Sequence, residues 1–409
     1  MFNQKKYHFV GIGGIGVSAI ARMLSLKGKI VTGSDSNQSE ITDDLEKLGI
    51  KIFIGQRAEN LEKDVEVVIY SIAIKEDNPE ILEAQKRGLF CVSYPQALGE
   101  LSKEMFTIAI SGTHGKTTTT AMIGHIMQKA GLDPTVIVGS KILGKNSNFI
   151  AGKSKYLVVE ACEYKRSFLN LSPTILVITN IEADHLDYYK DLDDIKSAFK
   201  ELEQKVPKDG FVVKEDDYKK VKIDFVLLVS GEHNILDAQA AIKTAELLGI
   251  PQEKSKEFLK DFRGTWRRLE YKGEKDGNIF YDDYAHHPTE ISASLNTLHE
   301  KYPDRKIVCV FEPHQQSRTK LLFDDFVNAL KIADEIFIAP ILITRETDDG
   351  TTNNKVLAEA INKTKPSQSV ENPQELKNFL QKMNPQKLLC VVLMGAGNIY
   401  KWTDEVMSL

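Results

Sequence analysis

Cysteine is scarce in this 409-residue chain: there are four, Cys91, Cys162, Cys309 and Cys390, and none stands at a zinc-site or redox-pair spacing. We expect them to be reduced, mostly buried strand residues of a cytoplasmic protein. Long hydrophobic runs are also lacking, since no segment reaches the roughly 18 unbroken apolar residues of a membrane span. An apolar stretch follows Lys5 and Lys6, but its glycines favour a strand-to-helix turn over a signal peptide.

A strong excess of positive charge is missing too. The chain has 53 Lys and Arg against 58 Asp and Glu, a formal net charge of -5 with neutral histidine. Tight binding to nucleic acid is therefore not expected, and any anionic ligand must be held by a local cluster of residues. The composition, 42% hydrophobic and 27% charged, excludes collagen-like and disordered chains.

Short apolar runs alternate with helix-period stretches along nearly the whole chain, as is typical of βα units and parallel sheets. We expect an α/β protein of three domains, over residues 1–104, 105–263 and 264–409. The expected strands are Tyr7–Val10, Lys29–Thr32, Val65–Ser71, Leu89–Val92, Phe106–Ile110, Tyr156–Val159, Thr174–Thr179, Ile279–Tyr281, Lys306–Phe311, Glu335–Ala339 and Leu388–Met394. Helices are expected at Val17–Leu26, Ile235–Leu248 and Leu321–Ile332.

A glycine-rich turn follows the first expected strand. Gly11, Gly13 and Gly16 form a GxGxxG pattern just before an apolar helical stretch. Glycine permits the tight turn and lets a diphosphate approach the backbone amides at a helix N-terminus. Asp35 follows the next strand, where a dinucleotide fold places its ribose-binding acid. The pattern favours a bound diphosphate over glycines that serve only packing, and it leaves NAD, FAD and a UDP-sugar open.

A second glycine-rich turn, GTHGKTTTT over residues 112–120, joins an apolar strand to an amphipathic helix. Strand, glycine turn, lysine, hydroxyl and helix come in the order that a nucleoside triphosphate requires. Lys116 would neutralise the β- and γ-phosphates and Thr117 would ligate Mg²⁺. The residues expected to bind ATP here are Gly112, Thr113, His114, Gly115, Lys116, Thr117 and Thr118. Ile110 stands where a general P-loop has its first glycine, so this is a shorter variant.

Oxygen ligands for magnesium are expected near Lys116. Glu160 closes the run Tyr156–Val159, at the edge where parallel strands open toward a nucleotide. The next strand ends in NIEADHLD, which supplies Asn180, Asp184, His185 and Asp187. A histidine among acids after a strand is either a further metal ligand or a surface hydrogen-bonding group, and the neighbouring P-loop favours the first.

The third series of strands carries its own polar residues. Pro288 and Glu290 fit the first and third positions of a helix, which places Asp283, His286 and His287 in the preceding loop. Asp283 could hold an ammonium group, and one of the histidines could hold or relay its proton. His314 and Arg318 follow another strand and could bind a carboxylate. The alternative is that the histidine pair only caps and packs the helix.

Eight motifs, in order along nearly the whole chain, together resemble the Mur ligases. They are HFVGIGGIG, GTHGKTTTT, EACEYKRSF, TNIEADHLD, HNILDA, GTWRRLE, DDYAHHPTE and FEPHQQSRT. The resemblance implies a Rossmann-like N-terminal domain for a UDP-sugar and a central P-loop ATPase-like domain. It also implies a C-terminal Rossmann-like domain that closes over ATP and binds an amino acid. The implied reaction joins L-alanine to the carboxylate of UDP-N-acetylmuramate in peptidoglycan synthesis, with ATP as co-substrate and Mg²⁺ as cofactor.

The resemblance also implies roles for individual residues. Gly13, Gly14 and Ile15 would hold the UDP-sugar diphosphate, with Asp35 and Ser71 near the sugar nucleotide. Thr117, Glu160 and His185 would serve magnesium. Asn234 would face ATP, and Arg268 would reach its γ-phosphate. We expect Lys116, Arg268, Asp283 and His286 to be catalytic, and Asp283, His287, His314 and Arg318 to bind the amino acid.

The sequence departs from the family pattern in two places. The stretch from Val206 to His233 is short, which predicts a trimmed central sheet. Tyr94 and Pro95 replace the more basic residues often found after the fourth strand. Three other functions stay open: a recycling ligase that joins a tripeptide to the same sugar, an NAD-dependent oxidoreductase, and a non-catalytic nucleotide sensor. We expect a monomer or homodimer without nucleic-acid or membrane partners.

Overall fold

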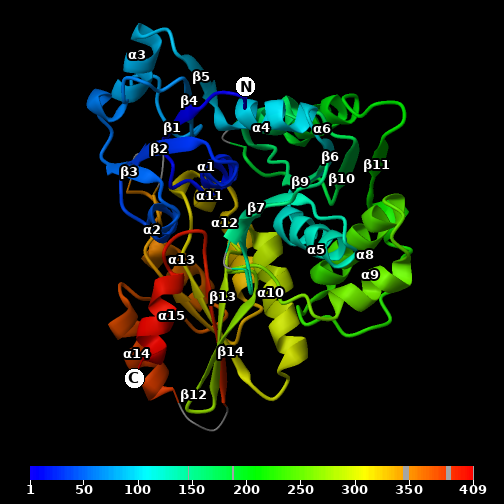
Figure 1. The fold of residues 1–409 in the computed structure, drawn as a ribbon. Helices are drawn as coiled ribbons and strands as arrows, with labels where there is room; N and C mark the ends of the chain where they lie inside the picture. Colours follow the sequence, from blue (N-terminus) through cyan, green and yellow to red (C-terminus); the bar gives the residue numbers. More distant parts are fainter. Residues whose placement is uncertain (146, 187, 344–349, 384–387, 409) are drawn as a thin grey trace. The chain divides into compact units, whose positions relative to one another are not determined.

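The computed structural model describes residues 1–145, 147–186, 188–343, 350–383 and 388–408. The chain folds into two compact units. The N-terminal unit comprises Met1–Val226 and Leu236–Phe262, and the C-terminal unit comprises Leu227–Ile235 and Arg263–Leu409. Each unit is built from α/β layers, as expected, and the predicted limits at residues 104 and 263 stay predictions (Figure 1). None of the helices in the described ranges has both the length and the apolar character that crossing a bilayer requires.

The first sheet of the N-terminal unit is fully parallel, with strand order β3-β2-β1-β4-β5. Its strands are β1 (Lys6–Val10), β2 (Ile30–Asp35), β3 (Lys51–Ile54), β4 (Val67–Tyr70) and β5 (Phe90–Ser93). Its helices are α1 (Ile15–Leu26), α2 (Glu40–Lys47), α3 (Pro79–Lys86) and α4 (Tyr94–Lys103). The chain order reverses between β1 and β4. Open α/β sheets bind ligands at the carboxyl ends of the strands at such a point.

The second sheet has the order β11-β10-β6-β9-β7-β8, parallel except for the hairpin β7–β8. Its strands are β6 (Phe106–Ser111), β7 (Thr135–Ile142), β8 (Ser147–Ile150), β9 (Tyr156–Glu160), β10 (Ile175–Ile178) and β11 (Phe211–Val213). Its helices are α5 (Lys116–Lys129), α6 (Leu192–Glu203), α7 (Glu215–Tyr218), α8 (Glu232–Leu247) and α9 (Gln252–Leu259). The central strand β6 thus delivers its carboxyl end between the ends of β9 and β10.

The C-terminal unit holds the third sheet, of order β12-β13-β17-β14-β15-β16, in which only β12 runs antiparallel. Its strands are β12 (Glu270–Lys275), β13 (Asn278–Asp283), β14 (Lys306–Phe311), β15 (Glu335–Ile338), β16 (Ser367–Ser369) and β17 (Leu389–Met394). Its helices are α10 (Pro288–Lys301), α11 (Gln316–Leu321), α12 (Phe323–Leu330), α13 (Asn354–Asn362), α14 (Pro373–Lys382) and α15 (Tyr400–Met407).

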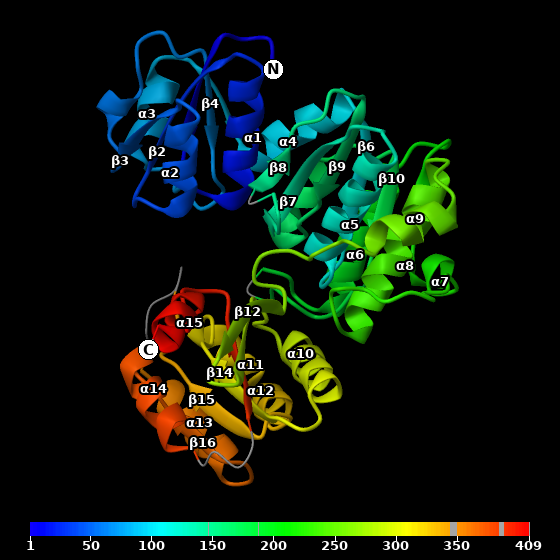
Figure 2. The ribbon, with the colours of Figure 1, turned by 60° about the horizontal axis from the view of Figure 1, so that its bottom comes forward.

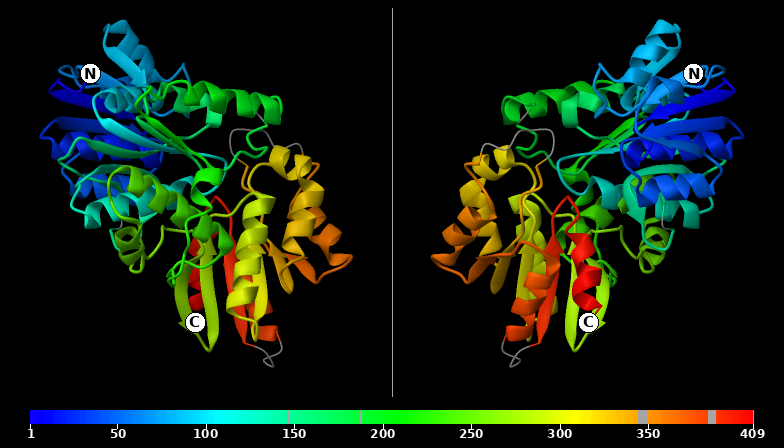
Figure 3. Two further views of the ribbon diagram at one scale, coloured as in Figure 1. Left: turned by 90° about the vertical axis from the view of Figure 1, so that its right-hand side faces the viewer. Right: turned by 90° about the vertical axis from the view of Figure 1, so that its left-hand side faces the viewer.

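Alternate residues of β14 belong to two separate cores of this unit. Ile307, Cys309 and Phe311 pack with α10, α12 and α13, whereas Val308 and Val310 pack with α14 and α15. Because successive strand residues point to opposite faces, the sheet is covered on both sides, as Figure 3 shows. The continuous apolar run of β14 is the sequence signal of such a doubly covered strand.

The expected helix Leu321–Ile332 is present as α12, Phe323–Leu330, and Leu321 ends the preceding helix α11. Two expectations about local structure were wrong. Cys162 is exposed and lies after β9 rather than within a buried strand. Asp35 and Asp283 are the last residues of β2 and β13, not loop residues that follow them.

Candidate active site

The second glycine turn joins β6 to α5 and depends on glycine at two positions. Gly112 and Gly115 have φ angles of 139° and 79°, which side-chain-bearing residues rarely adopt. A Cβ on Gly112 would lie 2.0 Å from Thr179 Oγ1, and one on Gly115 would lie 2.3 Å from Asp237 Oδ1. Both the backbone angle and the space therefore require glycine here, and the turn leads directly into the N-terminus of α5.

The end of β10 holds the turn in place. Asn180 Oδ1 accepts from the His114 amide at 2.9 Å, and Asn180 Nδ2 donates to the His114 carbonyl at 3.1 Å. Thr179 Oγ1 donates to the same carbonyl at 2.6 Å. Asn180, which the sequence grouped with possible metal ligands, therefore positions the phosphate turn through its side chain.

Lys116 has a buried acidic partner that sequence reasoning missed. Its Nζ lies 2.9 Å from Glu163 Oε2 and donates to the Gly112 and Thr113 carbonyls at 2.6 and 3.0 Å. Burial lowers the pKa of Lys116, but the negative charge of Glu163 outweighs this, so the pKa lies above its usual value. Glu163 follows β9 by three residues within EACEYKRSF, and its position after a strand end was the available signal.

Two oxygen ligands suited to magnesium meet beside the turn. Thr117 Oγ1 donates to Glu160 Oε2 at 2.9 Å, and the same carboxylate oxygen accepts from the Gly139 amide at 2.7 Å. A hydroxyl and a carboxylate at the end of a phosphate-binding turn are the hard oxygen donors that Mg²⁺ prefers, so the donor set fits this ion.

His185 lies next to the acidic partner of Lys116. Its Nε2 is 3.6 Å from Glu163 Oε1, and its ring centroid is 4.8 Å from that of Tyr164. Its φ of 54° is unusual for a side-chain-bearing residue and marks a constrained backbone. The structure therefore brings His185 to the edge of the phosphate site, and its metal role stays a prediction. Asp187 lies outside the described residues.

The first glycine turn lies where β1 and β4 end. Asp35 and Ser71, the acid and the hydroxyl residue expected near the sugar nucleotide, lie beside it. The Gly13 amide donates to Asp35 Oδ2 at 2.9 Å. A Cβ on Gly11 would lie 3.0 Å from Ser71 Cβ, and Gly11 has a φ of 76°. Asp35 thus holds the loop with one carboxylate oxygen. Gly14 is the N-cap residue and Ile15 the first residue of α1, so the turn presents a helix N-terminus, where anions bind.

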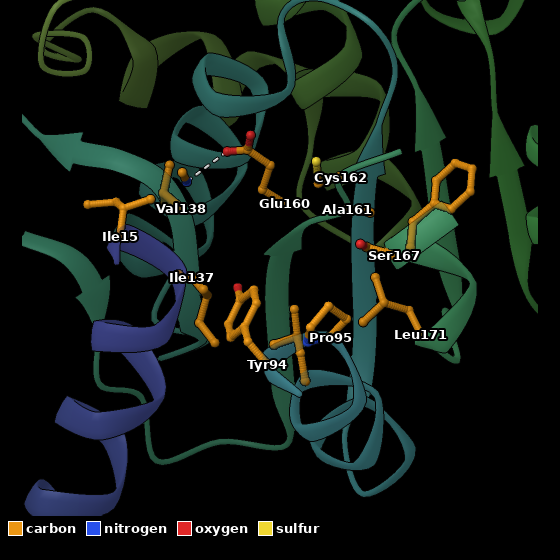
Figure 4. Close-up of a pocket in the computed structure, with 14 residues that line it drawn as sticks. Ile15, Tyr94, Pro95, Ile137, Val138, Glu160, Ala161, Cys162, Ser167 and Leu171 are labelled. Carbon is orange, nitrogen blue, oxygen red and sulfur yellow. Dashed lines mark hydrogen bonds between the residues drawn. The ribbon is translucent and has the colours of Figure 1, made fainter. Parts of the chain in front are cut away.

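The third glycine of the pattern has a different neighbour. A Cβ on Gly16 would lie 2.6 Å from the ring carbon Cζ of Tyr94, so this glycine makes room for the tyrosine at the start of α4. Tyr94 helps to line a cavity of about 240 Å³. Ile15 and Gly16 of the first turn and Glu160 of the phosphate site also line it (Figure 4). This cavity of the N-terminal unit therefore reaches from the first glycine turn to the carboxylate that contacts Thr117.

In the C-terminal unit, Asp283 is buried at the end of β13. The Ser294 hydroxyl donates to its Oδ2, and the Ala285 amide donates to its Oδ1 at 3.2 Å. Burial raises the pKa of Asp283, and the hydrogen bond from Ser294 opposes this effect. A buried carboxylate that already accepts two hydrogen bonds is a firmly positioned acceptor for an ammonium group.

The neighbouring histidines have different environments. His287 is the N-cap of α10, where its Nδ1 accepts from the Thr289 amide at 3.3 Å. His286 Nδ1 lies 3.0 Å from the Tyr284 carbonyl, and the His286 amide donates to Glu290 at 3.0 Å. Capping, the simpler alternative for the pair, therefore applies at least to His287.

His314 and Arg318 follow β14 in the C-terminal unit. The ring centroids of His314 and His286 are 6.1 Å apart in an edge-to-face arrangement. The two histidines expected at different parts of the amino-acid site are thus neighbours. Arg318 lies in α11, the first helix after β14. The role of Arg318 in binding the amino acid stays a prediction.

The two arginines of GTWRRLE, Arg267 and Arg268, differ in burial. Arg268 is partly exposed, with its guanidinium 5.0 Å from the Tyr284 ring centroid and 3.6 Å from Glu290. Arg267, which sequence reasoning passed over, is buried and donates to the Gly395 carbonyl. Burial lowers the pKa of Arg267. Arg267 is therefore built into the fold, whereas Arg268 keeps an accessible face for a ligand.

Asn234 belongs to the segment Leu227–Ile235 of the C-terminal unit. Its side-chain amide donates to the Ser230 carbonyl at 2.6 Å and lies 3.1 Å from His233 Nε2. The side chain is thus fixed at the start of α8, and the expected contact with ATP stays a prediction.

The fold and the two glycine turns are suited to a nucleoside triphosphate and a second, diphosphate-bearing ligand. Three family models match the chain: "Mur ligase family, catalytic domain" over residues 6–105, "Mur ligase middle domain" over 110–226, and "Mur ligase, glutamate ligase domain" over 267–397. The chain belongs to the Mur ligase family.

Relatives with assigned names agree with this assignment. The chain is 40% identical to a UDP-N-acetylmuramate–L-alanine ligase of Clostridium acetobutylicum, covering 99% of this chain and 98% of the relative. A UDP-N-acetylmuramate–alanine ligase of Thermotoga maritima has a similar solved structure, with a TM-score of 0.82, 29% identity and 99% coverage of both chains. A murein peptide ligase of Psychrobacter arcticus has a TM-score of 0.72 at 23% identity, covering 99% of this chain and 98% of its own.

Proposed function

We propose that this chain joins L-alanine to the carboxylate of UDP-N-acetylmuramate and converts ATP to ADP and phosphate. The observation that carries the proposal is the cavity lined by Ile15 and Gly16 of the first glycine turn and by Glu160, the carboxylate that accepts from Thr117 after the second turn. A substrate with a diphosphate at one end and a reacting carboxylate at the other needs such a route between a diphosphate site and a triphosphate site. The relative from Clostridium acetobutylicum, with its 40% identity, bears the name of this reaction.

The first chemical step activates the carboxylate. The lactyl carboxylate of the sugar attacks the γ-phosphorus of ATP, the bond from that phosphorus to the bridging oxygen breaks, and ADP leaves with the electron pair. Lys116 lies where it can stabilise the charge on the transferred phosphoryl group, and Glu163 holds it there. Thr117 and Glu160 would hold magnesium, which would supply positive charge to the phosphates, and His185 is the further candidate ligand, 3.6 Å from Glu163.

The second step forms the amide. The deprotonated amine of L-alanine attacks the acyl carbon, and the tetrahedral intermediate expels phosphate. Asp283 is a suitable partner for the ammonium group, and His286 and His314 are candidates for taking its proton. Arg318 and His287 are candidates for holding the amino-acid carboxylate and backbone. Arg268 is proposed to contact the γ-phosphate, and Asn234 the nucleotide.

The test is ADP release coupled to a spectroscopic readout, with UDP-N-acetylmuramate and each candidate amino acid in turn. We expect ADP release with L-alanine and little ADP release in reactions that lack an acceptor amino acid. Lys116→Ala should abolish ADP release while UDP-N-acetylmuramate still binds, because the sugar nucleotide contacts the other turn. Undiminished turnover of this variant would refute the assignment of the phosphate site.

A tripeptide-recycling ligase is the nearest competing function, since a murein peptide ligase shares the fold. The higher TM-score of the Thermotoga maritima enzyme, 0.82 against 0.72, favours alanine. Phosphate release with L-alanine and with tripeptide as acceptors decides between the two. An oxidoreductase would instead bind NADH, which a fluorescence titration detects.

We further propose that the enzyme works in the cytoplasm, where ATP is available and cysteines stay reduced. The described structure includes all four cysteines as free thiols. A monomer or homodimer would suffice, because the residues assigned to each substrate come from one chain.

A further inference from the structure

The hairpin β7–β8 touches the phosphate site at one of its strands. The Gly139 amide, in β7, donates to Glu160 Oε2 at 2.7 Å, the oxygen that also accepts from Thr117 Oγ1. A Cβ on Gly139 would lie 2.5 Å from the same carboxylate oxygen. A residue with a side chain at position 139 would therefore collide with the proposed magnesium ligand, Glu160.

The other strand of the hairpin touches the first glycine turn. Asn148, in β8, is buried, and its Nδ2 donates to the Ile15 carbonyl and, at 3.3 Å, to Ser18 Oγ. Ile15 is the first residue of α1, the helix whose N-terminus faces the proposed diphosphate. Figure 2 shows β8 beside α1. A second contact is the ion pair of Lys141 with Glu40, at the start of α2, with a distance of 3.0 Å.

The two contacts are joined by the hairpin itself. Its register pairs Ile137 with Phe149 and then shifts before Ile142 pairs with Ser147, so Gly139 and Asn148 both lie in the irregular stretch between these two pairs. Ile137, Val138 and Gly139 also form a wall of the cavity. A continuous set of contacts thus runs from Thr117 through Glu160 and the hairpin to the first turn of α1.

We propose that Asn148 is a positioning residue that holds the diphosphate turn in register with the phosphate site. This inference rests on the proposed function, because it assigns the two turns to UDP-N-acetylmuramate and ATP. An asparagine amide is suited to the task because it offers two N–H donors from a short side chain. Loss of this donor removes the side-chain hydrogen bonds from β8 to the first turn of α1, while the Ile15 carbonyl keeps the Ser18 hydroxyl as a donor at 2.8 Å.

The test compares Asn148→Ala and Asn148→Asp with the unaltered protein. Asn148→Asp replaces the donor by a carboxylate that faces the Ile15 carbonyl. We expect the KM for UDP-N-acetylmuramate to rise about tenfold, with the KM for ATP and the melting temperature nearly unchanged. Asn362→Asp is the matched control: it makes the same chemical change but keeps the acceptor oxygen that the Ser367 amide uses.

Coupling between the sites supplies an independent readout. Calorimetry would measure the affinity for UDP-N-acetylmuramate with and without a magnesium complex of a non-hydrolysable ATP analogue. The affinity should depend on the analogue in the unaltered protein and depend on it less in Asn148→Ala. Ser18→Ala removes one acceptor of Asn148 and one donor to the Ile15 carbonyl but keeps the Asn148 bond to that carbonyl. It should give a smaller effect and serves if the Asn148 variants fail to fold.

Three results would overturn the inference. The first is an unchanged KM for UDP-N-acetylmuramate in the Asn148 variants, and the second is a rise in both KM values together with a fall in melting temperature. The third is an affinity for UDP-N-acetylmuramate that does not depend on the ATP analogue in the unaltered protein. Failure of the proposed function is visible separately, because the unaltered protein would then release no ADP with UDP-N-acetylmuramate and L-alanine.

Discussion

Lys116 meets a buried carboxylate and two carbonyl oxygens before any phosphate is considered. Glu163 keeps the lysine charged in a site where burial alone would favour the neutral amine. Its backbone is held in turn, since the Tyr189 hydroxyl donates to the Glu163 carbonyl at 2.5 Å. The acid is therefore a positioning residue for the lysine that the phosphate chemistry needs.

Glu163→Gln should lower kcat at least tenfold, because it removes the negative charge that orients Lys116 and raises its pKa. The loss should be greatest at alkaline pH, where a lysine with a less elevated pKa begins to lose its proton. A pH profile of ADP release measures this. Glu201→Gln is the matched control, because Glu201 pairs with Arg166 on the surface at 3.0 Å. Equal activity of both variants would contradict the role.

Asp282 offers a test of pH-dependent stability in the C-terminal unit. Burial raises its pKa to about 6, and the hydrogen bond from the Thr403 hydroxyl opposes this effect. A carboxyl with a raised folded-state pKa favours the folded protein at low pH and disfavours it once ionised. Its contribution to stability is therefore lost as the pH rises from about 4 to about 6.

We expect Asp282→Asn to raise the free energy of unfolding at pH 7.5 by about 1–3 kcal/mol relative to pH 5. Urea unfolding at both pH values measures the difference. A stabilisation that does not depend on pH would contradict the assignment, since it would come from packing and not from the charge.

At the level of elements, the sequence predicted strands well where they are apolar throughout. β14 was expected with its observed bounds, Lys306–Phe311, because both of its faces are buried. β12 and β16 were missed, since EYKGEK and SQS carry no apolar pattern and are strands only through pairing with neighbours. β7 was missed as well, because its apolar run is interrupted by Gly139, which contacts Glu160, and by Lys141, which pairs with Glu40.

The site residues follow the same division. The phosphate turn was predictable, since its glycines, lysine and hydroxyl are adjacent in the chain. Glu163 and Asn148 were not, because their partners lie 47 and 133 residues away and only the fold brings them together. Gly16 fits its pattern but accommodates Tyr94, a contact that the motif does not reveal.

His287, at the start of α10, has two possible roles, capping the helix and binding the amino acid, and two variants distinguish them. His287→Ala should lower the free energy of unfolding by about 1 kcal/mol, because the Thr289 amide loses its acceptor. His287→Asn should restore stability, since asparagine is a favoured N-cap residue. If His287 also binds the amino acid, the KM for L-alanine should stay raised in His287→Asn. Recovery of both quantities would assign the residue to capping alone.

At the level of the whole molecule, both glycine turns and the cavity belong to the N-terminal unit. A fragment of residues 1–262 should therefore fold and bind UDP-N-acetylmuramate within about tenfold of the full chain's affinity. It should form no amide, because the residues proposed to bind L-alanine are missing. Calorimetry and the coupled assay measure the two properties. A fragment that folds but does not bind the sugar nucleotide would contradict the placement of that site.

The central sheet ends at the short strand β11, Phe211–Val213, and α8 begins at Glu232. The expectation that the short stretch from Val206 to His233 reflects a trimmed central sheet stays a prediction. The alignment with the Clostridium acetobutylicum relative spans 452 positions, more than the 409 residues of this chain, so that relative carries insertions. The phosphate site does not depend on them, because its residues come from β6, β9 and β10.

The cavity beside Tyr94 has walls of Leu98, Ile137 and Phe168 and reaches from the first glycine turn to Glu160, the proposed magnesium ligand. An inhibitor could exploit this shape with a uridine-like head, an apolar tether and a phosphate mimic. Once one end is seated, the other is confined near its own target at a high effective concentration, provided that the tether matches the span. Both ends of the inhibitor would bind to the N-terminal unit, so the length of the tether would set both affinity and selectivity.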